Sequence, residues 1–423
     1  MGLSDLFKPR WRHSDYRVRV KQAEALKDPA ILAQIALRDE SGDVRLTALS
    51  RLSDQMVIAQ IASSDPKPSN RMYALERLHD RGGLTQVMNN QRGSLNVRLA
   101  AAIKLGDAAS AQTLCTQLAL SSGAPTGTSD LVRDIIADEA SLIQVATGAK
   151  ESHVRAAAAL KVCDQNALRA IALSDPDDGV RRCAVANITD QNILYDVVLS
   201  ANDWKVREAA AEKLTNQALI AKLVIEKCGA VRPGIVKDGY VVHSGLSGDL
   251  DILIKKCTDK DVLERSARSI SPGVRAAAVA QVNDQVLLAE VAIADESFDV
   301  RNVAINNLTD QAALAAVAGS DAHFTLRWDV VSRLTDQGIL AELAKNSPER
   351  SLRVHAVEWM TDKFLLADLA HSGPEGREEE VVKEVHLGGD EFRDRTTLEF
   401  VPDARETARG RLAELKRRRH NKS

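Results

Sequence analysis

Eleven arginines recur at regular intervals along the chain, usually directly after a valine, and could act together. They are Arg19, Arg45, Arg71, Arg98, Arg155, Arg181, Arg207, Arg275, Arg301, Arg327 and Arg353. A guanidinium group is a planar fork of donors that suits either a phosphate or a carboxylate. The spacing therefore indicates a ladder of cations that binds a polyanion or is paired inside the protein.

An acidic column accompanies the arginines. Nine residues after most of them comes a signature of an apolar residue, any residue, aspartate and glutamine, with a spacing of 26 residues almost throughout. Because each arginine has an aspartate in its own or the adjacent unit, we favour internal pairing, and a phosphate-binding ladder is the alternative. The predicted structural ladder comprises Arg45, Arg181, Arg207, Arg301, Asp54, Asp190 and Asp310.

Histidine and cysteine show no metal-binding pattern. The nine histidines are scattered, none is followed by glutamate, and the five cysteines never form CxxC. These spacings argue against a zinc ribbon, a helical metal site and a disulfide framework. We expect no catalytic, cofactor-binding or metal-binding residues, and we expect Cys183 and Cys257 to be small buried thiols in a reducing compartment.

Each 26-residue unit has the pattern of two short helices. In the first, Val44, Ala48 and Leu52 recur at i, i+4 and i+8, which places them on one helical face. In the second, apolar residues recur in pairs, as over 57–62. Helices this short must bury their apolar stripes against neighbouring units, so the pattern predicts stacked repeats.

Capping residues fix where these helices begin. The signature aspartate is predicted to cap the second helix, and a Ser or Asp four residues before the repeat arginine to cap the first. Pro29, Pro68 and Pro272 then fall at first helical positions, where proline is favoured. The sequence predicts an all-α fold, an α-solenoid of about 13 two-helix repeats with a 26-residue period.

The Val-Arg, Ala and Leu-Thr-Asp pattern resembles bacterial HEAT-like repeats of the phycobilisome-lyase type over about 15–369, which is most of the chain. It is also similar to leucine-rich-repeat-variant arrays. Two enzymes share the resemblance. Deoxyhypusine hydroxylase binds iron through His-Glu pairs, which this sequence does not contain, and no local signature carries over the lyase activity of bilin lyases. A tetrapyrrole-handling lyase or enzyme subunit stays as an alternative function.

Four aromatic residues share one register, three residues before a repeat arginine: Tyr16, Trp204, Phe298 and Phe324. Only 3% of the chain is aromatic, so this grouping is notable. We expect these rings to pack between the starts of adjacent helices. The alternative is an exposed aromatic edge, with Trp204, Phe298 and Phe324 as candidate partner-binding residues.

The repeat is interrupted by insertions at 121–130 and 229–248. The second contains Ile235–Lys237 and Tyr240–Val242 around Asp-Gly, a β-hairpin pattern in an otherwise helical chain. Its Lys237, Tyr240 and His243 are candidate partner-binding residues, although a tolerated surface insertion is the simpler interpretation.

The two ends differ from the repeats. We divide the chain into an N-terminal cap (1–14), the solenoid (15–373) and a charged C-terminal tail (374–423) with a possible small hairpin and a final helix. The tail ends in the basic sequence KRRRHNK, which could contact nucleic acid. The formal charge of −3 and the mixed polar residues of the second helices make nucleic-acid binding along the repeats improbable.

These features together predict a non-catalytic scaffold that presents an extended surface to a protein partner. No apolar run approaches the roughly 20 residues that span a bilayer, and the first residues lack a secretory signal. We therefore expect a cytoplasmic bacterial protein without a cofactor or membrane span, and a monomer rather than an oligomer.

Overall fold

The computed structural model describes residues 9–230, 235–237, 240–242, 247–320, 323–375, 377–388, 391–401 and 403–420. In the strands, at Ala230, at Phe324 and over 418–420 only the backbone is described. Contacts divide the chain into two units, Met1–Lys213 (unit 1) and Leu214–Ser423 (unit 2). The described residues are predominantly helical, which is compatible with a helical repeat.

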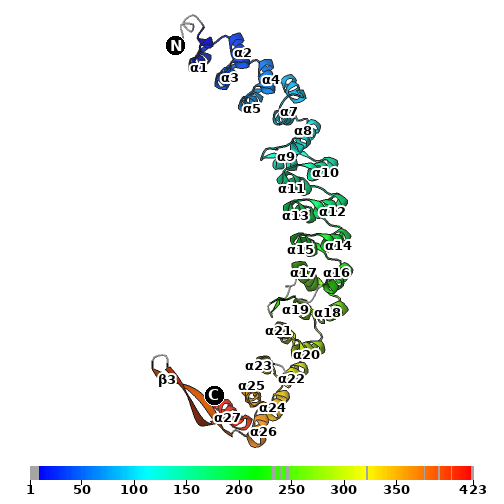
Figure 1. Ribbon diagram of the computed structural model, residues 1–423, viewed down its shortest axis with the longest axis vertical. Coiled ribbons are helices and arrows are strands. Elements are labelled where there is room, and N and C mark those ends of the chain that lie inside the picture. Colours follow the sequence, from blue (N-terminus) through cyan, green and yellow to red (C-terminus); the bar gives the residue numbers. More distant parts are fainter. Residues whose placement is uncertain are drawn as a thin grey trace. The chain divides into compact units, whose positions relative to one another are not determined.

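In unit 1, a short 3-10 helix (Arg10–Arg12) precedes alternating first and second helices, which form two adjacent rows (Figure 1). The first helices are α1 (Tyr16–Ala25), α3 (Gly42–Arg51), α5 (Pro68–Arg77), α7 (Leu95–Leu105), α9 (Thr128–Ile135), α11 (Ser152–Ala159), α13 (Asp178–Asn187) and α15 (Trp204–Lys213). The second helices are α2 (Pro29–Arg38), α4 (Gln55–Ser64), α6 (Arg81–Asn89), α8 (Ala108–Leu120), α10 (Glu139–Gly148), α12 (Gln165–Ser174) and α14 (Gln191–Ser200).

Unit 2 continues the same alternation (Figure 1). Its second helices are α16 (Gln217–Ala230), α18 (Lys260–Ser266), α20 (Gln285–Ala294), α22 (Gln311–Ala318), α24 (Gln337–Asn346) and α26 (Lys363–Ser372). Its first helices are α17 (Gly248–Lys256), α19 (Pro272–Val279), α21 (Phe298–Asn307), α23 (Phe324–Ser332) and α25 (Arg350–Trp359), and α27 (Ala404–His420) packs against α25 and α26.

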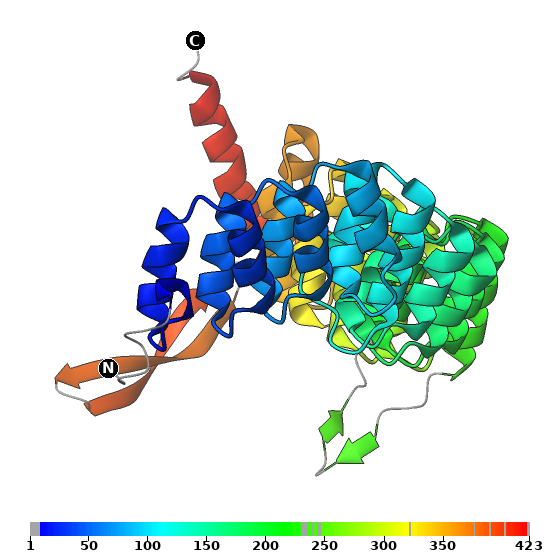
Figure 2. The same cartoon turned by 90° about the horizontal axis from the view of Figure 1, so that it is seen from above.

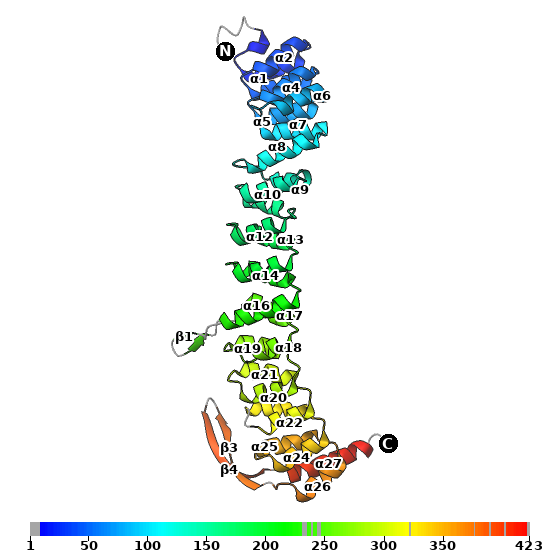
Figure 3. The same ribbon diagram turned by 90° about the vertical axis from the view of Figure 1, so that its right-hand side faces the viewer.

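Two antiparallel strand pairs lie in unit 2. Strands β1 (Ile235–Lys237) and β2 (Tyr240–Val242) pair with Val236 opposite Val241, and they stand apart from the helices (Figure 2). Strands β3 (Arg377–Gly388) and β4 (Glu391–Val401), which follow α26 and precede α27 along the chain, form a longer ribbon (Figure 3).

The core consists of the apolar stripes of neighbouring helices. The predicted stripe of the first helix is confirmed, since Val44, Ala48 and Leu52 are buried. In the second helix the buried positions are Ile58, Ala59, Ile61 and Ala62, while Val57 is half-buried. Small and branched aliphatic side chains let short helices pack closely, which is why the chain needs few aromatic residues.

The predicted starts of the second helices are confirmed. Asp54 Oδ1, for example, accepts the N–H groups of Met56 at 2.9 Å and Val57 at 3.3 Å, two of the amides that have no acceptor within the helix. Pro29, Pro68 and Pro272 also lie at the start of their helices, as predicted.

Helices extend into both predicted insertions. Helix α9 begins at Thr128, inside the stretch 121–130, and the side chains of Thr128 and Val132 are buried. Helix α16 extends through Ala230, inside the stretch 229–248.

Candidate functional site

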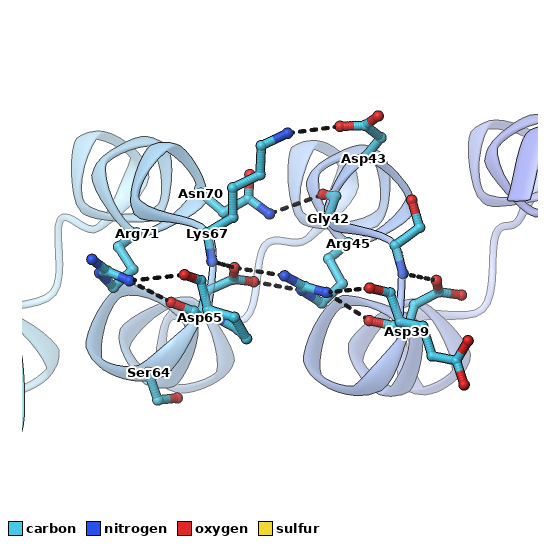
Figure 4. A network of polar contacts seen from close by, with 12 residues as sticks. Asp39, Gly42, Asp43, Arg45, Ser64, Asp65, Lys67, Asn70 and Arg71 are labelled. Atoms are coloured by element: carbon cyan, nitrogen blue, oxygen red, sulfur yellow. Dashed lines mark hydrogen bonds and ion pairs between the residues drawn. The ribbon is translucent and has the colours of Figure 1, made fainter.

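Arginines of the column form ion pairs in both unit 1 and unit 2, as the contact between Arg45 and Asp65 illustrates (Figure 4). The guanidinium group donates from Nε to Asp65 Oδ2 at 2.8 Å and from Nη2 to Oδ1 at 2.9 Å. Arg45 is only 6% exposed and Asp65 only 5%. This is a buried, bidentate ion pair between consecutive repeats.

Backbone contacts link one pair to the next. Arg45 Nη1 also donates to the carbonyl oxygens of Asp39 at 2.7 Å and Glu40 at 3.2 Å. Asp39 in turn receives the guanidinium of Arg19 on its carboxylate, at 2.8 and 3.0 Å. Each loop aspartate therefore binds one arginine through its side chain and the next through its carbonyl.

The same arrangement recurs through both units. Bidentate pairs join Arg155 to Asp175, Arg275 to Asp295, and Arg353 to Asp403, while Arg181 contacts Asp203 at 2.7 Å and Arg327 contacts Glu349 at 2.7 Å. Arg207 and Arg301 donate to the carbonyl oxygens of Ala201 and Asp295. Asp403, just before α27, supplies the carboxylate for the last of these arginines.

The predicted acidic members of the ladder were wrong. Asp54, Asp190 and Asp310 accept backbone N–H groups at the starts of α4, α14 and α22 and do not receive an arginine. The reason is geometric. The repeat arginine lies in the first turn of its helix and the signature aspartate lies beyond the other end, roughly 14 Å away along the axis. For Arg45, Arg155 and Arg275 the acidic partner is instead the aspartate 20 residues later, in the loop after the second helix. Arg181 contacts Asp203, which lies 22 residues later.

The buried ladder leaves little capacity for an external anion. All three donor nitrogens of Arg45 and of Arg155 are engaged by carboxylate and carbonyl oxygens of the protein. The hydrogen bonds that Arg45 donates to Asp65 raise the pKa of Arg45. Burial raises the pKa of Asp65, but the bonds from Arg45 and from the Lys67 amide outweigh it, so the pKa lies below its ordinary value. The geometry favours a structural role over phosphate binding.

A second inter-repeat contact uses the glutamine of the signature, to which sequence reasoning gave no role. Gln285 Oε1 accepts the N–H groups of Thr309 at 2.8 Å and Asp310 at 2.9 Å, in the next repeat. The same contact is made by Gln55, Gln165, Gln311 and Gln337, and by the carboxylate of Glu139. In the sequence, only the recurrence of Gln directly after the signature Asp indicated this contact.

A third contact satisfies the carbonyl groups at the ends of the first helices. Lys104 Nζ donates to the carbonyl oxygens of Leu75 at 2.9 Å and Glu76 at 2.7 Å, in the preceding repeat. Arg77 and Arg333 make equivalent contacts one repeat back. A cation here complements the negative end of the helix dipole.

Trp204 lies on the edge of the repeats where each second helix ends and the next first helix begins, which we call the loop edge. Its side chain is 55% exposed, and Lys205 Nζ lies 5.6 Å from the ring centroid. The expectation that this ring packs between adjacent helix starts is therefore wrong. In the same turn Val206 is buried, so the first turn of α15 packs on one side and Trp204 lies on its solvent-facing side.

Phe298 has the same register in unit 2. It is 46% exposed, and the ring of His323 meets it edge-on at 6.1 Å while the Arg301 guanidinium lies 5.7 Å away. Glu296 and Asp299 beside it are exposed. This surface combines an accessible aromatic ring with acidic groups. Tyr16, at the same position of α1, is exposed as well.

No contact among the described residues places the other candidate partner-binding residues at the loop edge. The structure describes only the backbone of Phe324, at the start of α23, and of Lys237 and Tyr240, at the paired ends of β1 and β2. His243 lies outside the described residues.

The cysteines are free thiols. Cys115 and Cys257 are buried, as expected for Cys257, whereas Cys183 is only half-buried. Burial raises the pKa of Cys115 to about 11, so this thiol stays protonated near neutral pH. Among the described side chains, no three His, Cys, Asp or Glu residues come together in a way that could hold a metal ion.

Comparison with known proteins adds no identification: no protein-family model and no curated protein matches this chain. No helix in the described part of the chain combines the length and apolar character that a membrane span requires.

Proposed function

We propose that the chain is a solenoid of about 13 two-helix repeats, similar to bacterial HEAT-like repeat proteins, and acts as a non-catalytic scaffold that binds a partner protein. The observation that carries the proposal is the exposure of Trp204 and Phe298 at equivalent positions on the loop edge. Large aromatic side chains held on a rigid helix start are typical anchors of protein interfaces.

The internal contacts support this assignment. The polar groups that recur in many of the repeats, namely the arginine, the loop aspartate and the signature glutamine, bind one another or the backbone. A repeat protein whose recurring polar groups are engaged internally is suited to recognition by its edges.

The chemistry of the edge indicates the kind of partner segment. Phe298 offers an apolar surface with Glu296 and Asp299 beside it, so it suits an apolar side chain flanked by a basic residue. We place the scaffold in the bacterial cytoplasm, because the five free thiols fit a reducing compartment.

Affinity capture from the native host tests the proposal. The tagged chain should enrich a partner, and Trp204→Ser with Phe298→Ser should reduce its recovery by roughly tenfold, as expected for the loss of two interface anchors. Met56→Ser with Val286→Ser is the matched control, since these exposed residues begin second helices at the opposite edge of each unit. Equal recovery with both double variants would contradict the proposal.

A further inference from the structure

The arginine ladder lacks its carboxylates at one place in unit 1. Arg71 and Arg98 belong to consecutive repeats and bond only to backbone carbonyl groups among the described residues. Arg71 donates from Nη1 to the carbonyl oxygens of Asp65 at 2.7 Å and Pro66 at 3.3 Å (Figure 4). Arg98 donates from Nε to the carbonyl oxygen of Met88 at 2.8 Å. Neither guanidinium group has a described acidic partner.

The sequence explains why the carboxylates are missing. In four pairs of the ladder the aspartate lies 20 residues after the arginine. The residue 20 positions after Arg71 is Gln91. Between residues 81 and 129 the only acidic residue is Asp107, whose side chain caps the start of α8 at the opposite edge of the repeat. The loops after α6 and α8, where the partners of Arg71 and Arg98 would lie, therefore contain no acidic residue.

Both guanidinium groups are withdrawn from water without a counter-charge. Arg98 is only 9% exposed, and the Nε of Arg71 is buried with no acceptor among the described residues. The Asp65 carboxylate is not available to Arg71, because both of its oxygens receive Arg45. A buried cation is costly unless an anion compensates it. An external anion would supply the charge that the described residues do not.

The two arginines meet at one loop. Where the ladder is complete, a loop aspartate binds one arginine through its carboxylate and the next through its carbonyl. By the same relation Arg71 and Arg98 flank the loop 90–94, which joins α6 to α7, and Arg98 reaches the last turn of α6 at Met88. Arg92, within this loop, is exposed and adds a third positive charge without a described acidic partner.

We propose that this cluster, Arg71, Arg92 and Arg98, binds a phosphate group. Nε and Nη2 of Arg71 form a fork that takes two oxygens, as the fork of Arg45 takes a carboxylate. The terminal nitrogens of Arg98 bind the remaining oxygens. A phosphate group carries about −1.5 to −2 charges at neutral pH, so it compensates both buried arginines, whereas a carboxylate compensates one. The start of α7, which follows the loop, also favours an anion.

Titration of the isotope-labelled full chain with inorganic phosphate, followed by NMR, tests the site. The amide signals of 90–98 should shift saturably with a Kd of about 1 mM or lower. Gln91→Asp places a carboxylate 20 residues after Arg71, so it should compete for the fork and weaken phosphate binding about tenfold or more. Gln86→Asp is the matched control. It adds the same charge on the exposed face of α6 and should change the Kd by less than about threefold.

Thermal unfolding separates loss of binding from a folding defect. Because Gln91→Asp gives a buried arginine a counter-charge, it should raise the midpoint of unfolding in phosphate-free buffer, and Gln86→Asp should not. A lower midpoint for Gln91→Asp would contradict the assigned position of the anion.

Two further ligands define the chemistry. Acetate at the same ionic strength should bind about tenfold more weakly than phosphate, since it carries one charge. O-phosphoserine distinguishes the two sources of a phosphate group. Tighter binding of O-phosphoserine than of inorganic phosphate indicates a phosphorylated side chain of another protein, and the reverse order indicates the free anion.

Three results would overturn the proposal: no saturable shift in 90–98 up to about 20 mM phosphate, equal Kd values for the wild-type chain and Gln91→Asp, or equal affinity for acetate and phosphate. Partner capture through Trp204 and Phe298 does not depend on any of them.

Discussion

At the scale of single residues, the buried ion pair of Arg45 and Asp65 should contribute strongly to the stability of its repeat. Asp65→Asn keeps the shape of the side chain but leaves the guanidinium without its counter-charge in a buried site. We expect a loss of about 3–5 kcal/mol in local stability. Faster amide hydrogen exchange in α3 to α5 would measure it, since a repeat protein opens locally.

Asp43→Asn is the matched control for that change. Asp43 belongs to the same repeat and pairs with Lys67 at 2.8 Å, but both side chains are about half exposed or more. Exposed pairs of this kind contribute roughly 0–1 kcal/mol. Equal exchange rates in the two variants would show that burial of the ladder does not matter.

The ladder also predicts a dependence of stability on pH. The pKa values of Asp65 and Asp403 lie below their ordinary value of 3.8 in the folded protein. A carboxyl group with a depressed pKa stabilises the fold above the unfolded-state pKa, and this stabilisation is lost as the pH falls through the folded-state value. Stability should therefore fall below about pH 4.

Urea unfolding between pH 2 and pH 7 would measure this dependence. Asp65→Asn and Asp403→Asn remove the titrating groups, so each variant should lose less stability on acidification than the wild-type chain does. If the free energy of unfolding fell equally steeply with decreasing pH in all three chains, Asp65 and Asp403 would not be the groups that cause the pH dependence.

At the scale of helices and loops, the signature glutamine joins each repeat to the next. Gln311→Ala removes the acceptor of the Thr335 and Asp336 amides, which are bound at 2.8 and 3.1 Å. Because water can replace part of this contact at an exposed loop, we expect a loss of only about 1 kcal/mol. Gln60→Ala, on the exposed face of α4, should cost less, and urea unfolding would compare the two.

Much of this element-level organisation could be predicted from the sequence, because it depends on local rules. The helix phase followed from the capping aspartates and from prolines such as Pro68, and the structure confirms both. The partner of Arg45 could not be found in that way, since Asp54 and Asp65 are both plausible by type. Which of the two aspartates pairs with Arg45 depends on whether the start of the first helix lies beside the start or the end of the second helix.

The candidate surface was harder to predict for a related reason. Trp204 and Phe298 share a register that suggested packing, but both rings lie on the solvent-facing side of a helix start whose valine two residues later is buried. The glutamine contact likewise depends on the spacing between adjacent repeats, which no residue pattern within one repeat encodes. Sequence periodicity identifies recurring positions but not their surroundings.

At the scale of the whole molecule, the proposal separates partner binding from stability. Trp204 in unit 1 and Phe298 in unit 2 are the proposed contacts to a partner protein, whereas buried pairs such as Arg45 with Asp65 join the repeats.

Hydrogen exchange of the chain with its captured partner tests the central claim most directly. On binding, we expect slower amide hydrogen exchange in the first turns of α15 and α21, around Trp204 and Phe298, and little change at the starts of α4 and α20. Protection confined to the second-helix starts, or no protection in α15 and α21, would contradict it.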